Sequence, residues 1–290
     1  MEFFKDNYLE TSGSGDNWKV SFNSFVRQHQ NFYLESIRAA ELFWQKKQGK
    51  CFLMYSGGVD SEFILNVFLH LGMKIQPVII DFDYNKHDIK YALDFCNAKK
   101  LDPLVIKFNF NEFVKSGRIL NLALDCECAE YRLLSTFNVV EKLDGTILMG
   151  SHGPPHIALD QDSNSWKIDE LEVLHSVIKL FKNKNLYGCP FFLVYTIEQY
   201  LSFLKDPVMI QLVNNQIPGK LGNNSSKWRS FNNNNNFNMV QRTKYTGFEQ
   251  IEKSDIFSHN NIKIIESFKN KWNGKFEQEY FSLVAKLQGN

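Results

Sequence analysis

Short apolar runs alternate with segments of helical periodicity between residues 51 and 152, and this alternation restricts the fold more than any other feature of the chain. The runs contain few polar residues, which is typical of strands buried on both faces of a parallel sheet. We expect four strands, at residues 51–55, 77–80, 104–108 and 146–150. The helices expected between them cover residues 62–71, 88–99 and 128–143. This alternation predicts an α/β fold with a doubly wound, mostly parallel sheet.

The flanking parts of the chain have a different character. Residues 1–17 are polar and read as a loose segment, and the asparagine run at 232–236 predicts a flexible surface loop. Further helices are expected at residues 25–47, 170–182 and 198–205. We therefore divide the chain into an N-terminal extension with a helix, an α/β domain and a mainly helical C-terminal region, at residues 1–48, 49–155 and 156–290.

Charge and cysteine content limit the classes of partner and compartment. Lys and Arg number 33 against 32 Asp and Glu, a net charge of +1 that removes the simplest electrostatic argument for a nucleic-acid or membrane partner. A local basic patch can still exist. No apolar run approaches the roughly 18–20 residues of a membrane span, and the acidic N-terminus does not read as a secretory signal. Five cysteines without a disulfide-framework spacing favour a reducing compartment, so we expect a cytoplasmic protein.

The most informative motif follows the first strand directly and precedes a helix. It consists of Ser56, Gly57, Gly58, Val59, Asp60 and Ser61. The glycines allow positive φ angles, the serines supply hydroxyls, and the helix directs its free N–H groups at the turn, which predicts a pocket for phosphate oxygens. The motif matches neither GxxxxGK[ST] nor GxGxxG. The charge of Asp60 would repel phosphate, and a bridging Mg²⁺ would remove that conflict, so we expect Asp60 to bind Mg²⁺.

The string SGGVDS resembles the signature of the PP-loop superfamily, the N-type ATP pyrophosphatases, which includes asparagine, GMP and NAD synthetases and tRNA thiolation enzymes. Members of this Rossmann-like superfamily cleave ATP between the α- and β-phosphates, adenylate a substrate oxygen, and let a nucleophile displace AMP. The resemblance implies that the six motif residues hold the pyrophosphate part of ATP. It also implies that the end of the second strand, at Ile80 and Asp81, contacts adenine and ribose.

One feature is similar to the thiolation branch of the superfamily. Cys126 and Cys128 precede a helix that carries Arg132, and the next strand ends in Gly-Ser-His at His152. A Cys-x-Cys pair can be a nucleophile, a redox pair or half of a metal site, or its thiols can be core residues. Arg132 can face the phosphates from its helix. His152 stands where it can serve ATP or substrate, or make a capping hydrogen bond.

A second feature is similar to the late motifs of the asparagine synthetase domain. Lys227 is followed by an R-x-K element at Arg242 and Lys244. The resemblance implies that Lys244 stabilises negative charge on the pentavalent phosphorus, with Arg242 and Lys227 as supporting cations. The likeness is incomplete. The cysteine nucleophile that follows the initiator Met in that enzyme's glutaminase domain is replaced by Glu2, so we expect no glutamine hydrolysis by this chain.

These features predict an ATP-dependent, AMP-forming ligase that uses ATP and Mg²⁺ to activate a carboxylate for amide formation, with Asp60, Arg132 and Lys244 in the catalytic site. The acceptor is a small molecule or a nucleobase. One alternative is a nucleobase- or tRNA-modifying enzyme, by thiolation or amidation, in which Cys126 or Cys128 participates. A second alternative is a non-catalytic sensor of adenine nucleotides, against which the Mg²⁺-handling Asp60 argues.

Overall fold

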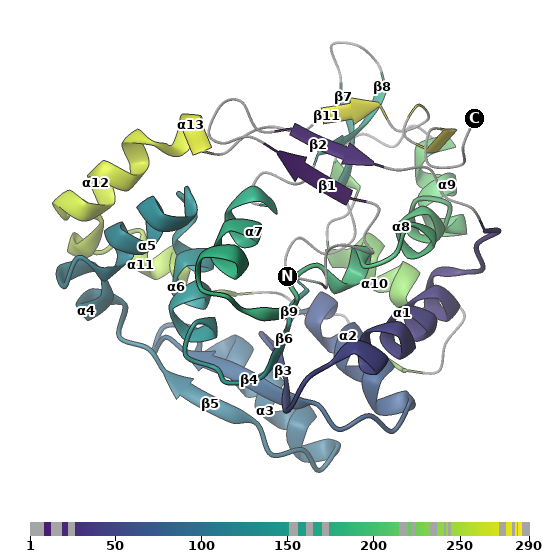
Figure 1. Ribbon diagram of the computed structural model, residues 1–290, viewed down its shortest axis with the longest axis horizontal. Helices are drawn as coiled ribbons and strands as arrows, with labels where there is room; N and C mark the ends of the chain where they lie inside the picture. Colours follow the sequence, from purple (N-terminus) through teal and green to yellow (C-terminus); the bar gives the residue numbers. More distant parts are fainter. Residues whose placement is uncertain are drawn as a thin grey trace.

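The structure is a computed structural model, and it describes residues 9–12, 19–22, 27–150, 156–160, 165–169, 174–214, 220–221, 224–232, 237–240, 242, 245–272, 277–279, 282 and 284–285. At its centre is a five-stranded sheet whose neighbouring strands are all parallel. In sheet order these strands are β5 (Leu104–Lys107), β4 (Gln76–Asp81), β3 (Cys51–Met54), β6 (Thr146–Leu148) and β9 (Tyr187–Cys189). The predicted α/β fold with a parallel sheet is confirmed (Figure 1).

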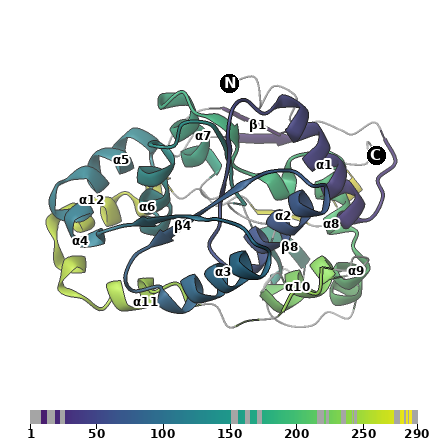
Figure 2. The ribbon, with the colours of Figure 1, turned by 90° about the horizontal axis from the view of Figure 1, so that it is seen from below.

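The chain builds this sheet from the middle outwards. It passes from β3 to β4 and β5 on one side, then returns past β3 to form β6 and β9 on the other. Because parallel crossovers are right-handed, the reversal puts the connecting helices on opposite faces. The first direction uses α2 (Val59–His70) and α3 (Lys86–Ala98), and the second uses α4 (Phe110–Lys115), α5 (Arg118–Cys126), α6 (Tyr131–Val140) and α7 (Leu174–Asn183). Figure 2 shows α5, α6 and α7 on one side of the sheet and α3 on the other.

Helix α2 is buried along most of its length because a second layer of helices covers it. It contacts β3 on one side and both α1 (Phe32–Lys46) and α10 (Asn224–Asn232) on the others. The Phe63 ring of α2 stacks on Phe231 of α10 with centroids 4.5 Å apart, and on Phe32 of α1 at 5.4 Å. This aromatic contact fixes α10, which comes late in the sequence, against the helix that follows the glycine motif.

The remaining elements surround this central unit. A four-stranded antiparallel sheet has the order β10 (Lys220–Leu221), β7 (His156–Asp160), β8 (Ser165–Asp169) and β11 (Glu277–Glu279). An N-terminal hairpin pairs β1 (Leu9–Ser12) with β2 (Lys19–Phe22). The other helices are α8 (Ile197–Leu204), α9 (Pro207–Asn214), α11 (Phe248–Ile251), α12 (Asn260–Ser267) and α13 (Lys269–Trp272), with 3₁₀ turns η3 (Phe192–Val194) and η4 (Asp255–Ser258). Within the described ranges, none of the helices combines the length and apolar character needed to cross a membrane.

The parallel sheet extends beyond the boundary that we predicted at residue 155. Its edge strand β9 comes from the stretch assigned to the C-terminal region. This strand has only three residues and contains Gly188, so it leaves no periodic signal in the sequence. The C-terminal region is also less helical than expected, because β7, β8, β10 and β11 form a sheet there. Short strands of this kind are easily missed in a polar context.

Other elements differ in their limits. The segment at 1–17, expected to be loose, contributes β1 to a hairpin. The helix expected from residue 25 begins at Phe32, where the Asn31 side chain caps it by accepting a hydrogen bond from the Leu34 N–H. The helix expected from residue 128 begins at Tyr131, after α4 and α5, which we did not predict. Of the asparagine run, Asn232 ends α10, and residues 233–236 lie outside the described residues.

The position of β9 makes a testable prediction at Gly188. Its φ is +149°, and a Cβ atom there would lie 1.9 Å from the carbonyl oxygen of Ile147 in β6. Gly188→Ala should therefore lower the free energy of unfolding in urea by about 3 kcal/mol or more, through clash and strain together. Gly72→Ala is the control, because its φ of +67° is also unusual but nothing lies within 4 Å; we expect it to cost only about 1–2 kcal/mol. Equal losses in the two variants would contradict the pairing of β9 with β6.

Candidate active site

Residues 56–61, which we call the glycine loop, comprise the turn after β3 and the first residues of α2, at the carboxyl edge of the parallel sheet. Strand β6 is the neighbour of β3 on the side where the winding reverses. A Cβ atom on Gly150, just beyond β6, would lie 3.9 Å from the Cβ atom of Asp60. The ends of the two strands therefore meet at the glycine loop. Ligands of doubly wound sheets bind at such a reversal point.

Gly57 gives the loop its bend. Its φ is +73°, which residues with a side chain rarely adopt. A Cβ atom at this position would lie 2.8 Å from the carbonyl oxygen of Asp88 and 3.2 Å from the Cβ atom of Ala92, both in α3. Glycine is therefore required here on two grounds, backbone conformation and close packing of the loop on α3.

The serine hydroxyls hold the loop in shape. The Ser61 hydroxyl donates to the Gly58 carbonyl at 3.1 Å and accepts from the Ser56 N–H at 3.3 Å. The Ser56 hydroxyl accepts from the Gly58 N–H at 3.3 Å. The Glu62 N–H donates to the Gly58 carbonyl at 3.0 Å, so the N–H groups of the helical residues before Glu62 have no acceptor within the helix. Together with the helix dipole, these groups can bind an anion.

Asp60 and Lys227 meet beside this loop. One carboxylate oxygen of Asp60, Oδ2, lies 3.8 Å from Lys227 Nζ of α10. The other oxygen, Oδ1, is buried and has no hydrogen-bond partner among the described residues. Lys227 is only 4% exposed. A buried ammonium group is unfavourable unless a negative group lies near it, so the contact with Asp60 compensates part of that cost.

Arg242 reaches the glycine loop from the C-terminal segment. Its Nη1 donates to the Gly57 carbonyl at 3.2 Å, its guanidinium pairs with the buried carboxylate of Glu62, and it lies 5.0 Å from the Tyr91 ring centroid. Burial lowers the pKa of the Arg242 guanidinium, and the neighbouring Tyr55 opposes this effect. These contacts of the Arg242 guanidinium are all with groups of the protein itself. Arg242 therefore holds the loop backbone in place, which differs from the predicted role of a cation near the phosphates.

The chain after Arg242 crosses the start of α3. The Tyr245 N–H donates to Asp88 Oδ1 at 3.1 Å. Gly247, with a φ of +79°, lies so close to the backbone of Tyr84 that a Cβ atom would be 2.5 Å from its carbonyl oxygen. Phe248 then packs edge-on against Phe82, which follows β4. This C-terminal segment thus contacts both the glycine loop and the turn after β4.

The end of β4, expected to contact adenine and ribose, forms a tight turn. Both carboxylate oxygens of Asp81 accept hydrogen bonds from Lys86 Nζ at 2.9 Å, and Oδ1 also accepts from the Asp83 N–H at 2.9 Å. Burial alone would raise the pKa of Asp81, but these hydrogen bonds outweigh it and the pKa is lowered. The Ile80 carbonyl accepts from the Asn85 side chain at 2.9 Å. Asp81 and Ile80 therefore shape the turn next to the glycine loop.

Cys126 and Cys128 are completely buried, at the end of α5 and just after it. Burial raises the pKa of each thiol to about 12. Thiolates are the reactive form of cysteine, so this environment disfavours a chemical role for either residue. Arg132 is 54% exposed on its side chain, lies 5.6 Å from the Phe248 ring centroid and lines a cavity of about 410 Å³. Its described contacts connect it to α11 and not to the glycine loop.

Two predicted site residues, His152 and Lys244, lie outside the described residues. The structure brings together Asp60, Lys227 and Arg242, which are far apart in the sequence. Sequence reasoning missed Glu62 and Asp88, the acidic partners of Arg242 and of the Tyr245 backbone. Both stand in the first turn of a helix that follows a strand of the sheet, and this position was the one available signal for them. Within the described ranges, no group of three His, Cys, Asp or Glu residues is arranged to hold a metal ion.

Comparison with protein-family models found no match for this chain. Comparison with curated proteins found no significant similarity.

The Arg242–Glu62 pair can be tested through stability. Arg242→Met would leave the Glu62 carboxylate buried without its partner, which should cost about 3–5 kcal/mol in urea unfolding. Adding Glu62→Gln should recover at least about 1 kcal/mol of that loss, because the two residues interact directly. Arg132→Met is the control: Arg132 lies 4.0 Å from Glu252, both side chains are about half exposed, and we expect a loss below about 1 kcal/mol. An Arg242→Met loss as small as the control's would contradict the assigned contact.

Proposed function

We propose that this chain is an ATP-dependent, AMP-forming ligase of the PP-loop type that activates a carboxylate for amide formation. One observation carries the proposal: Lys227 and Arg242, which the motif resemblance assigns to the same site as SGGVDS, both contact the glycine loop. Both residues are far from the loop in the sequence, so these contacts arise from the fold. The position of the loop at the winding reversal of the sheet, where ligands of such folds bind, supports the same proposal.

The residues of the loop fit a magnesium ion accompanied by phosphate. Asp60 presents a buried oxygen, Oδ1, that has no hydrogen-bond partner within the described residues. Mg²⁺ prefers oxygen ligands and is commonly held by one or two carboxylates, with water and substrate phosphates completing its shell. Asp60 can therefore be the one carboxylate that holds Mg²⁺, while the N–H groups at the start of α2 bind the phosphate that completes its shell. When bound, the ion would neutralise charge on the phosphate oxygens.

The protein groups would act in two steps of the proposed reaction. The N–H groups at the start of α2 would bind the pyrophosphate part of ATP, and the Lys227 ammonium would neutralise charge beside it. A substrate carboxylate oxygen attacks the α-phosphorus, and the bond to pyrophosphate breaks. An amine or ammonia then attacks the acyl carbon, AMP leaves with the electron pair of the bond that breaks, and the nitrogen releases one proton to solvent. By the resemblance, Lys244 would stabilise the charge that develops on the α-phosphorus.

The two alternatives have less support. Sulfur transfer through Cys126 or Cys128 conflicts with their complete burial and raised pKa values. Amidation of a nucleobase needs no thiol. It differs from the proposed reaction in the oxygen that is adenylated, which belongs to a nucleobase carbonyl and not to a carboxylate. A nucleotide sensor without catalysis has no need of Asp60, whose charge disfavours binding of an anion in the absence of a cation.

Pyrophosphate release from ATP tests the proposal. It should be measured with Mg²⁺, ammonium and a panel of carboxylic acids and amino acids. Asp60→Asn and Lys227→Met should each lower the rate at least about 10²-fold, the size of losing one charge-stabilising group. Lys263→Met, an exposed lysine on α12, is the matched control and should keep the wild-type rate. Circular dichroism should confirm that all three variants are folded.

Nucleotide binding by wild type without any release of pyrophosphate would favour the sensor, and an unchanged rate in Asp60→Asn would contradict the assigned site.

A further inference from the structure

A second candidate site lies at the opposite edge of the parallel sheet, where the strands begin. Two adjoining cavities are found there. One, of about 510 Å³, lies between the end of α1, the start of β3 and the end of α2. The other, of about 460 Å³, lies between the starts of β3 and β4, the end of α2 and the loop after α3. They share the lining residues Lys50, Cys51, Gly72, Met73 and Lys74. We call the two cavities together the basic groove. Helix α2, which has 12 residues and is about 18 Å long, separates it from the glycine loop.

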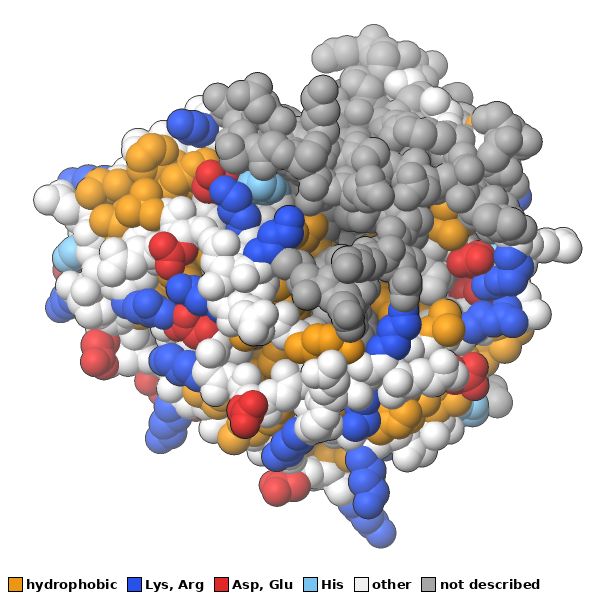
Figure 3. Space-filling model, viewed as in Figure 1, with side chains coloured by type: hydrophobic (Ala, Val, Ile, Leu, Met, Phe, Trp, Pro, Cys, Tyr) orange, Lys and Arg blue, Asp and Glu red, His pale blue; other side chains and the backbone are white. Residues whose placement is uncertain are grey.

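Positive charge is concentrated in this groove. It is lined by four lysines, Lys47, Lys50, Lys74 and Lys100, and Asp102 is the one acidic residue among the described residues that line it. None of the four lysines forms an ion pair within the described part of the chain. Because the whole chain has a net charge of only +1, this local excess is not a consequence of its composition. Figure 3 shows several Lys and Arg side chains, with a few Asp and Glu, along the lower edge of this face of the molecule.

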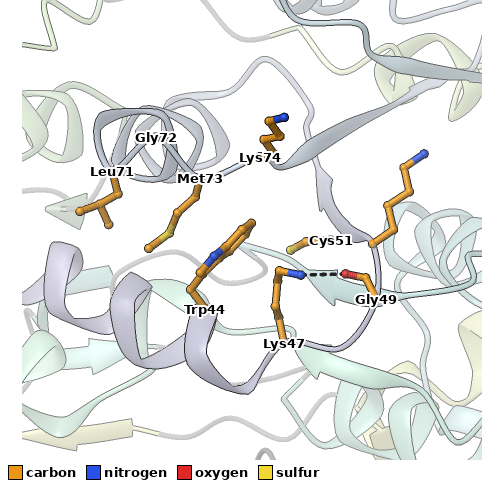
Figure 4. A pocket seen from close by; sticks show the side chains of 9 residues that line it. Trp44, Lys47, Gly49, Cys51, Leu71, Gly72, Met73 and Lys74 are labelled. Atoms are coloured by element: carbon orange, nitrogen blue, oxygen red, sulfur yellow. Dashed lines mark hydrogen bonds between the residues drawn. The ribbon is translucent and has the colours of Figure 1, made fainter.

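The floor of the groove is apolar. Figure 4 shows the Trp44 indole and the Met73 side chain pointing into the hollow, with Lys47 and Lys74 around them. The Lys47 ammonium lies 4.9 Å from the Trp44 ring centroid and donates to the Gly49 carbonyl at 2.9 Å. Trp44 also packs against Phe68 of α2, with ring centroids 6.1 Å apart. A partly exposed aromatic ring and a polarisable thioether therefore lie in the basic groove, among its lysines.

We propose that the basic groove binds single-stranded nucleic acid. Lysines along a groove attract successive phosphates, and an aromatic side chain at its floor offers a surface on which a base can stack. An anionic lipid surface fits less well, because apolar groups that insert into a membrane project outward, whereas Trp44 and Met73 are partly buried and line a cavity. The groove is remote from the glycine loop, so it would hold a nucleic-acid partner by its backbone and not at the reacting group. This inference does not depend on the proposed ligase activity.

Fluorescence anisotropy with labelled single-stranded RNA and DNA of mixed sequence, without ATP, tests the proposal. The double variant Lys50→Glu/Lys74→Glu should weaken binding at least tenfold relative to wild type. The slope of log K against log salt concentration should become smaller in magnitude by about one to two, since each lost phosphate contact lowers it by about one. Lys253→Glu/Lys263→Glu changes the net charge equally at exposed positions outside the groove and should bind within about twofold of wild type. Unchanged circular dichroism and thermal unfolding would confirm that both double variants are folded.

A third variant distinguishes base recognition from simple anion binding. Trp44→Leu keeps an apolar contact with Phe68, and it should weaken binding of the oligonucleotide several-fold while leaving binding of inorganic polyphosphate unchanged. Four results would overturn the proposal. They are the absence of binding by wild type at about 50 mM salt, equal losses in the two charge-reversal variants, no effect of Trp44→Leu on oligonucleotide affinity, and tighter groove-dependent binding to phosphatidylserine vesicles than to the oligonucleotide.

Discussion

Lys227 and Arg242 bring positive charge to the glycine loop from a segment that follows the whole parallel sheet in sequence. Both side chains are largely removed from water, and a buried cation costs several kcal/mol unless a negative or polar group compensates it. Asp60 and Glu62 on α2 supply that compensation. The loop and the C-terminal segment therefore depend on each other, and the stacking of Phe63 on Phe231 holds α10, which bears Lys227, against α2. The candidate site is complete only when the entire fold is formed.

The charged groups at the loop have separate tasks. The guanidinium of Arg242 is occupied by Glu62 and by the Gly57 carbonyl, so it maintains the shape of the loop. Lys227 contacts one oxygen of Asp60, and the other oxygen has no hydrogen-bond partner in the described residues. Helix N–H groups attract an anion, whereas Asp60 attracts a cation. An anion that arrives together with a cation, as a magnesium complex of a nucleotide does, satisfies both groups at once.

Local sequence signals predicted the part of the fold that local physics determines. Four apolar runs became β3, β4, β5 and β6. The inner strands β3, β4 and β6 are mostly buried, as the apolar runs predicted. The edge strand β5 is largely exposed, so its apolar run did not indicate burial on both faces. The three-residue strand β9 is too short to carry such a signal, and only its pairing with β6 defines it. In the site, the glycine motif and Asp60 could be identified because they are contiguous. The contacts of Arg242 with Glu62 and of Tyr245 with Asp88 could not, since long-range pairing leaves no periodicity.

The net charge of the chain could not predict the basic groove for a similar reason. A value of +1 is a sum over the whole chain, and it does not reveal that lysines from the end of α1, the end of α2 and the loop after α3 meet in one groove. The fold thus has two candidate sites at opposite edges of one sheet: the glycine loop, where two cations are paired with carboxylates, and the basic groove, whose lysines have no ion pairs within the described residues. We propose that the first binds the phosphates of a nucleotide and that the second binds the phosphates of a single-stranded nucleic acid.

Binding of a magnesium nucleotide to the glycine loop is the central requirement of the proposed function. Isothermal titration with α,β-methylene-ATP measures this directly, because the analogue cannot be cleaved at the bond that the proposed reaction breaks. We predict binding of one nucleotide per chain in the presence of Mg²⁺, with affinity at least about tenfold lower, a difference of about 1.4 kcal/mol, when the metal is removed. Absence of binding, or equal affinity with and without Mg²⁺, would contradict the central claim.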